Sequence, residues 1–292
     1  MHKSATPWAA GSTVLVKFGG NAMSVDAEEA LFTEVALLRA AGVRVALVHG
    51  GGPQIDAELA ANGIVTERID GQRVTTAETL AITEAVLCGV INPRLVLDLQ
   101  NFGIPAAGMS GQDGGMLTCD RRLPESLGYV GTVRAVAPQA ILEHLAANVV
   151  PVIAPLGIAA DFSTAYNVNA DEAAGAIAAG IEADALILIT NVDRVRRDEN
   201  DPASGIERMT ADEALAFAGS EACRSSMKPK VRAAAMAVRE GVARAQITSA
   251  TDLSSPQFLT SGTIVTKVLK RGGRKRAAYP GPFIRTSGED DT

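Results

Sequence analysis

Short apolar runs alternate along this chain with longer stretches in which apolar residues recur every three or four positions. Residues 14–17 and 43–48 are apolar runs typical of buried strands, and the segment between them carries apolar residues at helical spacing from Leu31 to Leu38. Residues 55–59 then predict a second helix. A strand–helix–strand–helix opening predicts a parallel sheet whose strands are joined by right-handed crossovers.

The same alternation continues to about residue 268. Further helices are predicted at 76–88, 93–102, 135–146, 171–179 and 230–240, with a short one capped by Thr210 and Glu213. Further strands are predicted at 149–154, 185–190, 245–248 and 263–268. The fold class predicted is therefore α/β: a three-layer αβα sandwich around a central, mostly parallel sheet.

Composition narrows this picture. Of 292 residues, 47% are hydrophobic and only 4% aromatic, so the core must consist mainly of Ala, Val, Leu and Ile. The net charge of −6 argues against a nucleic-acid binder, which needs a basic surface. Three widely spaced cysteines without a CxxC pair predict neither a disulfide framework nor a protein-bound metal, and they favour a reducing cytoplasm. Residues 1–11 lack a signal-peptide core, and no uninterrupted apolar run reaches the roughly 18 residues of a membrane span.

Two glycine-rich loops follow the first two strands: Lys17-Phe18-Gly19-Gly20 and His49-Gly50-Gly51-Gly52. Ligands of open α/β sheets bind beyond the carboxyl ends of strands, and glycines there let backbone N–H groups approach an anion closely. Together the loops predict a phosphate cradle, with the ammonium of Lys17 beside it. Either loop alone is equally consistent with a tight turn. The chain contains neither GxxxxGK[ST] nor GxGxxG, so no P-loop or dinucleotide site is predicted.

Three later segments carry further polar candidates. Arg73, in the segment 71–75, has the fork that binds a carboxylate, although an exposed loop arginine is the alternative. The segment 167–171 holds more Asn and Asp side chains than helix capping requires. Lys228 and Lys230 stand at a helix start, where a cation opposes the macrodipole, so either they meet an anionic partner or they form a solvated turn.

These segments occur in an order that resembles the amino acid kinase family, and within it the acetylglutamate kinase branch. The motifs are Lys17-Phe18-Gly19-Gly20-Asn21-Ala22-Met23, His49-Gly50-Gly51-Gly52-Pro53-Gln54, Gly71-Gln72-Arg73-Val74-Thr75, Tyr166-Asn167-Val168-Asn169-Ala170-Asp171 and Met227-Lys228-Pro229-Lys230. The resemblance extends from about residue 14 to residue 265. It implies two lobes: residues 1–180 for acyl-acceptor binding and dimerisation, and 181–270 for ATP. The basic and acidic residues after these lobes predict a flexible tail at 271–292.

The resemblance also implies a role for each matching residue. Lys17 and Lys230 would neutralise the transferred phosphoryl group, and Asp171 would orient both lysines. The remaining implied sites are Gly19, Gly20 and Gly50 for phosphate, Gly51, Gly52, Arg73 and Asn167 for the acceptor, and Thr190, Asn191, Val192, Met227 and Lys228 for the nucleotide.

The implied activity is transfer of the γ-phosphoryl group of ATP, with Mg²⁺, to the side-chain carboxylate of N-acetyl-L-glutamate in arginine biosynthesis. A carboxylate is already ionised at neutral pH, so no general base is needed, and His49 is expected to fix its glycine loop. The resemblance implies a homodimer. Only a short segment precedes residue 14, so the long N-terminal helix of hexameric, arginine-sensitive members is not expected.

Several positions depart from the acetylglutamate kinase pattern. Asn191 stands where that branch usually has Asp, Arg194 where it has Gly, and Ser225-Ser226 replace Gly-Gly. These changes keep open a sister kinase that phosphorylates aminoadipate or glutamate on a small acidic carrier protein, which the basic residues of 270–276 would attract. Aspartate and carbamate kinases are weaker alternatives. A non-catalytic amino-acid or nucleotide sensor is the alternative outside the enzymes.

Overall fold

A computed structural model describes residues 8–19, 24–250, 252 and 261–267. Its main sheet contains β1 (Thr13–Phe18), β2 (Arg44–His49), β5 (Ala106–Ser110), β8 (Val150–Ala154), β11 (Ala185–Thr190), β12 (Arg208–Thr210), β13 (Arg244–Ser249) and β14 (Thr263–Thr266). The strand order is β12-β14-β13-β11-β1-β2-β8-β5. All neighbours pair in parallel except β13 and β14, which are antiparallel. The predicted mostly parallel sheet is confirmed.

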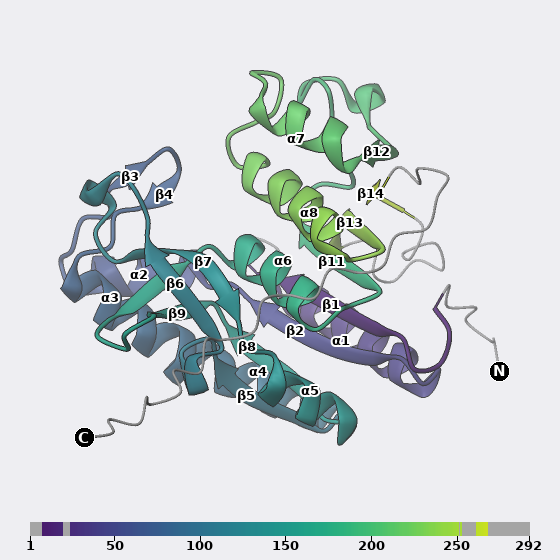
Figure 1. The fold of residues 1–292 in the computed structure, drawn as a ribbon, viewed down its shortest axis with the longest axis horizontal. Helices are drawn as coiled ribbons and strands as arrows, with labels where there is room; N and C mark the ends of the chain where they lie inside the picture. Colours follow the sequence, from purple (N-terminus) through teal and green to yellow (C-terminus); the bar gives the residue numbers. More distant parts are fainter. Residues whose placement is uncertain (1–7, 20–23, 251, 253–260, 268–292) are drawn as a thin grey trace, which may run out of the picture.

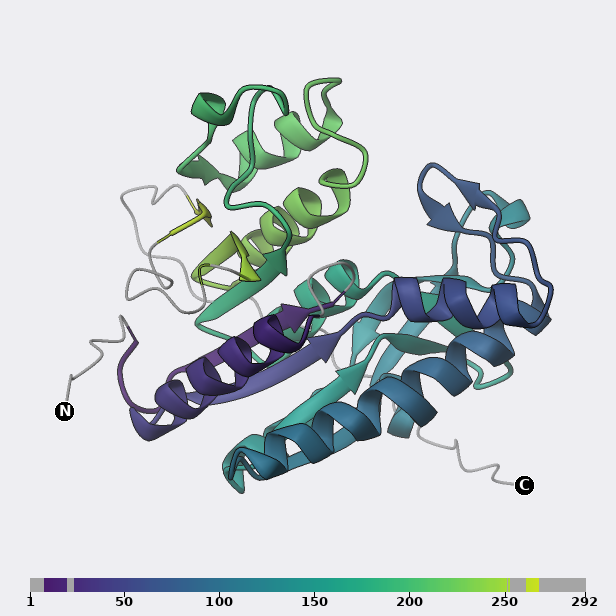
Figure 2. The same cartoon turned by 180° about the vertical axis from the view of Figure 1, so that it is seen from behind.

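Helices cover both faces of this sheet. One face carries α1 (Val25–Ala40), α2 (Gly52–Ala61), α3 (Ala77–Glu84) and α4 (Asn92–Asn101), as seen in Figure 2. The other carries α5 (Gln139–Ala146), α6 (Ala170–Gly180) and α8 (Lys228–Glu240), with α7 (Ala211–Gly219) packed on α8, as seen in Figure 1. Each face has its own apolar core, so the predicted three-layer sandwich is confirmed.

The pleat of β1 decides where Lys17 points. Val14, Val16 and Phe18 face the core beneath α1, whereas Leu15 belongs to the core beneath α6 and α8. Side chains alternate across a strand, so Lys17 shares the face of Leu15. Lys17 therefore lies at the carboxyl end of a central strand, on the side covered by α6 and α8.

A second group of strands lies beside the main sheet. A small closed barrel comprises β6 (Leu117–Arg121), β7 (Val130–Val136), β9 (Leu156–Ala159) and β10 (Ala165–Val168), and β3 (Arg68–Ile69) with β4 (Gln72–Arg73) forms a hairpin next to it. Short 3₁₀ turns cover Asp113–Gly115, Glu125–Leu127 and Pro202–Ser204. The helix predicted at 135–146 was wrong at its start, because residues 135–136 end β7 and α5 begins only after Pro138.

The helices predicted at 76–88 and 93–102 form one continuous rod. A π-helical segment, Ala85–Ile91, joins α3 to α4, and Pro93 is tolerated in the first turn of α4. By length and composition alone, the rod Ala77–Asn101 is apolar enough to cross a membrane. In the fold, Leu87, Ile91 and Leu95 are buried against the sheet, as they are in the core helix of a globular domain.

Small residues bring α6 and α8 close together. A Cβ added to Gly175 would lie 3.1 Å from the backbone oxygen of Ala233. Asp171 precedes Gly175 by one helical turn, and Lys230 precedes Ala233 by three residues. The close approach at Gly175 therefore sets the separation of Asp171 and Lys230 at the amino-terminal ends of the two helices.

We expect Gly175→Val to lower the free energy of unfolding by about 1–3 kcal/mol, because the branched side chain has no space against α8. Gly219→Val is the matched control, since Gly219 ends α7 and nothing lies within 4 Å of an added Cβ. Urea denaturation of both variants measures the difference. Equal effects of the two substitutions would contradict the close-packing explanation.

Candidate active site

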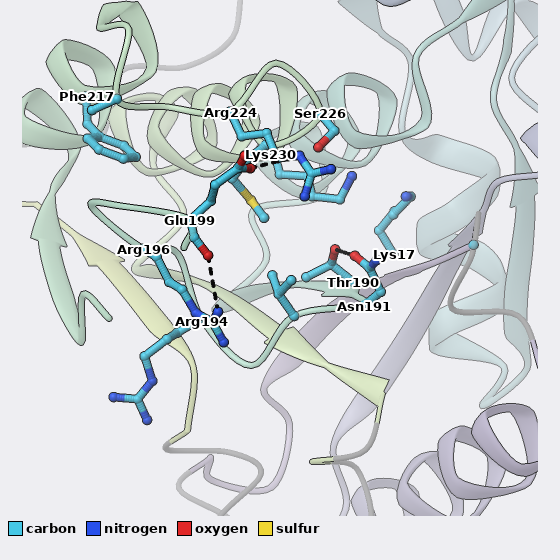
Figure 3. A pocket seen from close by; sticks show the side chains of 14 residues that line it. Lys17, Thr190, Asn191, Arg194, Arg196, Glu199, Phe217, Arg224, Ser226 and Lys230 are labelled. Atoms are coloured by element: carbon cyan, nitrogen blue, oxygen red, sulfur yellow. Dashed lines mark hydrogen bonds and ion pairs between the residues drawn. The ribbon is translucent and has the colours of Figure 1, made fainter. Parts of the chain in front are cut away.

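Three charged side chains from three elements meet at the carboxyl edge of the sheet. The Nζ atom of Lys17, from β1, lies 2.9 Å from Oδ1 of Asp171 in the first turn of α6. The Nζ atom of Lys230, from the first turn of α8, lies 3.1 Å from Oδ2 of the same carboxylate. Lys17 and Asp171 are buried. Lys230, at the start of α8, thus has Asp171 as its anionic partner. The ammonium groups of Lys17 and Lys230 point into one cleft (Figure 3).

Burial and charge compete in this triad. Burial disfavours the ionised form of Asp171, but the nearby ammonium groups of Lys17 and Lys230 outweigh it and hold the pKa of Asp171 at about 2. The pKa of Lys17 lies below its ordinary value, because burial and the charge of Lys230 outweigh the attraction of Asp171. Two cations facing one anion leave a net positive charge. An additional anion bound beside the two lysines would neutralise this charge.

The two glycine loops touch each other beside this triad. A Cβ on Gly19 would lie 2.4 Å from the backbone nitrogen of Gly50, so no larger residue fits there. The Gly50 N–H donates to the carbonyl of Phe18 across a distance of 3.0 Å. Gly52 begins α2 and Gly51 is its N-cap residue, so the N-terminus of this helix faces the same edge. Gly20, the remaining predicted phosphate contact, lies outside the described residues.

His49 is buried beneath its loop and holds it in place. The Nδ1 atom lies 3.1 Å from the carbonyl oxygen of Gly50, and Nε2 lies 3.1 Å from the side-chain nitrogen of Asn92. These partners assign a neutral ring that donates from Nδ1 and accepts at Nε2. Burial, with a smaller effect of Arg94, lowers the pKa of His49 to about 4. The ring is therefore a structural support rather than a proton carrier at neutral pH.

A cavity of about 460 Å³ opens beside Lys17 and Lys230 (Figure 3). Thr190, Asn191, Val192 and Met227, to which the resemblance assigns the nucleotide, line it, whereas Lys228 is not among its lining residues. The other side chains of the wall include Arg194, Arg196, Glu199, Phe217, Arg224 and Ser226. Glu199 and Arg224 form an ion pair of 3.2 Å within this wall.

Sequence reasoning missed this second set of lining residues. The loop after β11 and the segment before α8 converge on the cavity, although Arg194 and Arg224 lie 30 positions apart in the chain. The available signal was the concentration of arginines directly after an apolar strand, at residues 194, 196 and 197. Because no local pattern pairs that loop with the segment before α8, only the fold reveals their common wall.

Arg73 is buried on the other side of the triad, at the end of the hairpin. Its Nη1 atom is paired with the carboxylate of Asp56 on α2, and Nη2 donates to the carbonyl of Gly52 across 3.2 Å. Arg68 also contacts Asp56, at 2.9 Å, so two guanidinium groups share one carboxylate. Asn167 donates to the hydroxyl of Thr75 across 3.2 Å. Since the hydroxyl of Thr75 donates to the carbonyl of Arg73 across 3.0 Å, the predicted acceptor residues Gly52, Arg73 and Asn167 belong to one polar network, and Gly51 directly precedes Gly52.

Residues 12–249 match the amino acid kinase family, and the chain belongs to that family. Acetylglutamate kinase of Symbiobacterium thermophilum is 39% identical over 246 residues, covering 81% of this chain and 84% of that protein. Acetylglutamate kinase of Jannaschia sp. is 43% identical over 237 residues, covering 79% and 80%.

A solved structure shows the same fold at greater distance. N-acetylglutamate synthase from Neisseria gonorrhoeae, complexed with coenzyme A and N-acetyl-glutamate, has a TM-score of 0.76 and 24% identity. The match covers 89% of this chain and 61% of that protein, so this chain spans about three-fifths of its length. This likeness concerns the fold alone.

We expect the free energy of unfolding to decrease as the pH falls from 6.5 towards 4, because the folded state resists protonation of His49. The pKa of about 4, against 6.5 for a free histidine, corresponds to a loss of about 3 kcal/mol once the pH is below both values. Above pH 6.5 the contribution is fully present. Urea denaturation across this range measures it.

The His49→Asn variant should lose this part of the pH dependence, since no imidazole remains to be protonated. His144→Asn is the control, because that ring lies partly exposed on α5. Identical pH profiles for His49→Asn and the unaltered protein would rule out the buried neutral ring as the cause.

Proposed function

We propose that this protein catalyses ATP-dependent phosphorylation of the side-chain carboxylate of N-acetyl-L-glutamate, giving an acyl phosphate in arginine biosynthesis. The Lys17–Asp171–Lys230 triad, between a nucleotide-sized cavity and a polar acceptor network, is the observation that carries the proposal. The relatives described above bear the name of this enzyme and are matched over about four-fifths of their length.

The reaction requires positioning and charge neutralisation. A carboxylate oxygen of the acceptor attacks the γ-phosphorus, the new O–P bond forms, and the bond to the bridging oxygen breaks, so that ADP leaves with the electron pair. No proton is transferred, which agrees with a site whose histidine is buried and neutral. Lys17 and Lys230 stabilise the charge on the transferred oxygens, and Asp171 keeps both ammonium groups in place.

The acceptor lies, in this proposal, between the glycine loops and the polar network around Arg73. The guanidinium of Arg73 binds the carboxylate that does not react, while Asn167 and the backbone of Gly51 and Gly52 hold the rest of the molecule. Asp56 keeps the guanidinium in one orientation before the acceptor arrives. An arginine fixed in this way loses less side-chain entropy on binding than a free one.

ATP occupies the cavity lined by Thr190, Asn191, Val192 and Met227. Within residues 8–19, 24–250, 252 and 261–267, no group of three or more His, Cys, Asp or Glu side chains is placed to hold a metal ion. In this proposal Mg²⁺ enters with the nucleotide, bound to its phosphates, as is usual for a cation that keeps several waters. Lys17 and Lys230 supply the positive charge that faces the phosphates, since Arg194, Arg196 and Arg224 on the cavity wall are each paired with an acidic side chain.

The alternatives are less well supported. A carrier-bound acceptor was suggested by Asn191 and by the basic segment 270–276, but that segment lies outside the described residues, and the relatives above are named for the free amino acid derivative. A sensor without catalysis would have no use for a buried lysine and a buried aspartate with a second, partly buried lysine beside them, because burying charges is costly. Location in the cytoplasm remains an expectation from cysteine usage and composition.

Hydroxamate trapping of the acyl phosphate tests the activity. With Mg-ATP and N-acetyl-L-glutamate we expect hydroxamate from the unaltered protein, and a loss of at least about 100-fold in turnover for Lys17→Met or Asp171→Asn. Lys267→Met is the control, because Lys267 is exposed beyond β14. No hydroxamate from the unaltered protein would reject the proposal, and full turnover in Asp171→Asn would remove the triad from the mechanism.

The protein is also proposed to be a homodimer that associates through the β5 edge of the sheet. β5 is an edge strand, and the neighbouring rod exposes Val90 (59%) and Leu97 (56%) on its surface. A second copy of the chain would bury both. Sedimentation should give a dimer that Leu97→Glu dissociates, whereas the exposed Val65→Glu, on the loop before the hairpin, should leave it intact. A stable hexamer would contradict the expectation.

A further inference from the structure

The side chain of Arg122 contacts three elements of the fold: β7, the β3–β4 hairpin and α6. It directly follows β6, and its side chain is only 15% exposed. Its Nε atom donates to the hydroxyl of Thr132 on β7 across 3.0 Å. Its Nη1 atom donates to Oε1 of Gln72 on the hairpin across 3.2 Å and to Oε1 of Glu172 on α6 across 3.0 Å. Its Nη2 atom donates to the second oxygen of Glu172.

Two of the three partners of Arg122, Gln72 and Glu172, are direct neighbours in sequence of proposed site residues. Gln72 precedes Arg73, the proposed ligand of the acceptor, and Glu172 follows Asp171, which orders the lysines. Successive helical residues point about 100° apart, so Asp171 faces β1 and α8 while Glu172 faces the hairpin and barrel. Both acids lie in the first turn of α6, where the positive end of the helix dipole stabilises a negative charge. Asn169 caps this turn, because its side-chain oxygen accepts hydrogen bonds from the N–H groups of Asp171 and Glu172.

The hairpin depends on such side-chain contacts. Its strands have two residues each and pair with each other, not with the main sheet. An isolated two-stranded hairpin is marginally stable in water. Asp56 holds one side of it through Arg68 and Arg73, and Arg122 holds the other through Gln72. A bidentate guanidinium–carboxylate pair, as between Arg122 and Glu172, is the strong and directional form of this contact.

We propose that Arg122 is a positioning residue that fixes the Arg73 hairpin relative to the phosphoryl-transfer triad and so sets the affinity for the acceptor. The expected effect on acceptor affinity rests on the proposed function, whereas the role of Arg122 in holding the hairpin does not. Arg122 does not line the nucleotide cavity, so its loss should affect the acceptor and not ATP.

The first measurement is hydrogen exchange of peptides covering residues 66–75, without any substrate. We expect Arg122→Met to exchange at least several-fold faster there, because the hairpin has lost its side-chain contact with Arg122. Arg134→Met is the matched control: Arg134 also pairs with an acid across β6 and β7, Asp120 at 3.5 Å, but both side chains are 63% exposed. Unchanged exchange in Arg122→Met, or equal acceleration in Arg134→Met, would overturn the link.

The second measurement is steady-state kinetics with the acceptor and with Mg-ATP. For Arg122→Met we expect the KM for the acceptor to rise about tenfold, which corresponds to the loss of about one charged hydrogen bond. The KM for ATP should stay within about twofold. Equal changes in both constants would indicate a general structural defect and would overturn the positioning role.

Gln72→Leu provides a second route if Arg122→Met folds poorly. This substitution removes only the contact of the hairpin with Arg122 and leaves the Arg122–Glu172 pair in place. It should reproduce the faster exchange and the higher KM for the acceptor, and combining it with Arg122→Met should add little. Additive effects of the two changes would show that they act independently. Should the unaltered protein not use N-acetyl-L-glutamate, the exchange experiment alone still decides the link.

Discussion

One carboxylate between two ammonium groups organises this molecule. Asp171 lies between Lys17 and Lys230 in a buried position, and each of the three comes from a different element of the αβα sandwich. Burying these charges is costly, and the lowered pKa of Lys17 reflects that cost. A bound phosphoryl group would neutralise the excess positive charge of the two lysines. Because the buried site has a low dielectric constant, each attraction between these lysines and the phosphoryl oxygens would be strong.

The composition of the chain allows the elements that carry the triad to approach one another closely. Alanines and Gly175 let α6 and α8 approach until their first turns can share a carboxylate, and Gly19 lets the first loop touch the second. Large aromatic side chains would keep these elements apart. The low aromatic content and the alanine-rich core are therefore consistent with a site in which short helices and loops must meet closely.

The two sides of the triad differ in how they are built. The donor side is a cavity whose wall carries several arginines from the loop after β11 and the segment before α8. The acceptor side is a hydrogen-bonded network in which Asp56 orients Arg73 and Thr75 accepts from Asn167. Arg122 joins this network to α6, because it contacts both Gln72 on the hairpin and Glu172 on α6. The residue next to Glu172, Asp171, contacts the two lysines of the triad.

The sequence by itself determined the parallel sheet with its principal strands and helices, because periodicity is a local property. Its short motifs, through their resemblance to a known family, also marked Lys17, Asp171 and Lys230 as a candidate set. Tertiary structure decided the strands of the barrel and the continuous rod 77–101. It also decided which arginines line the donor cavity and which one ties the hairpin to α6. Arg122 lies 50 positions from both Gln72 and Glu172, and contacts over such separations depend on how the layers pack, which no local pattern records.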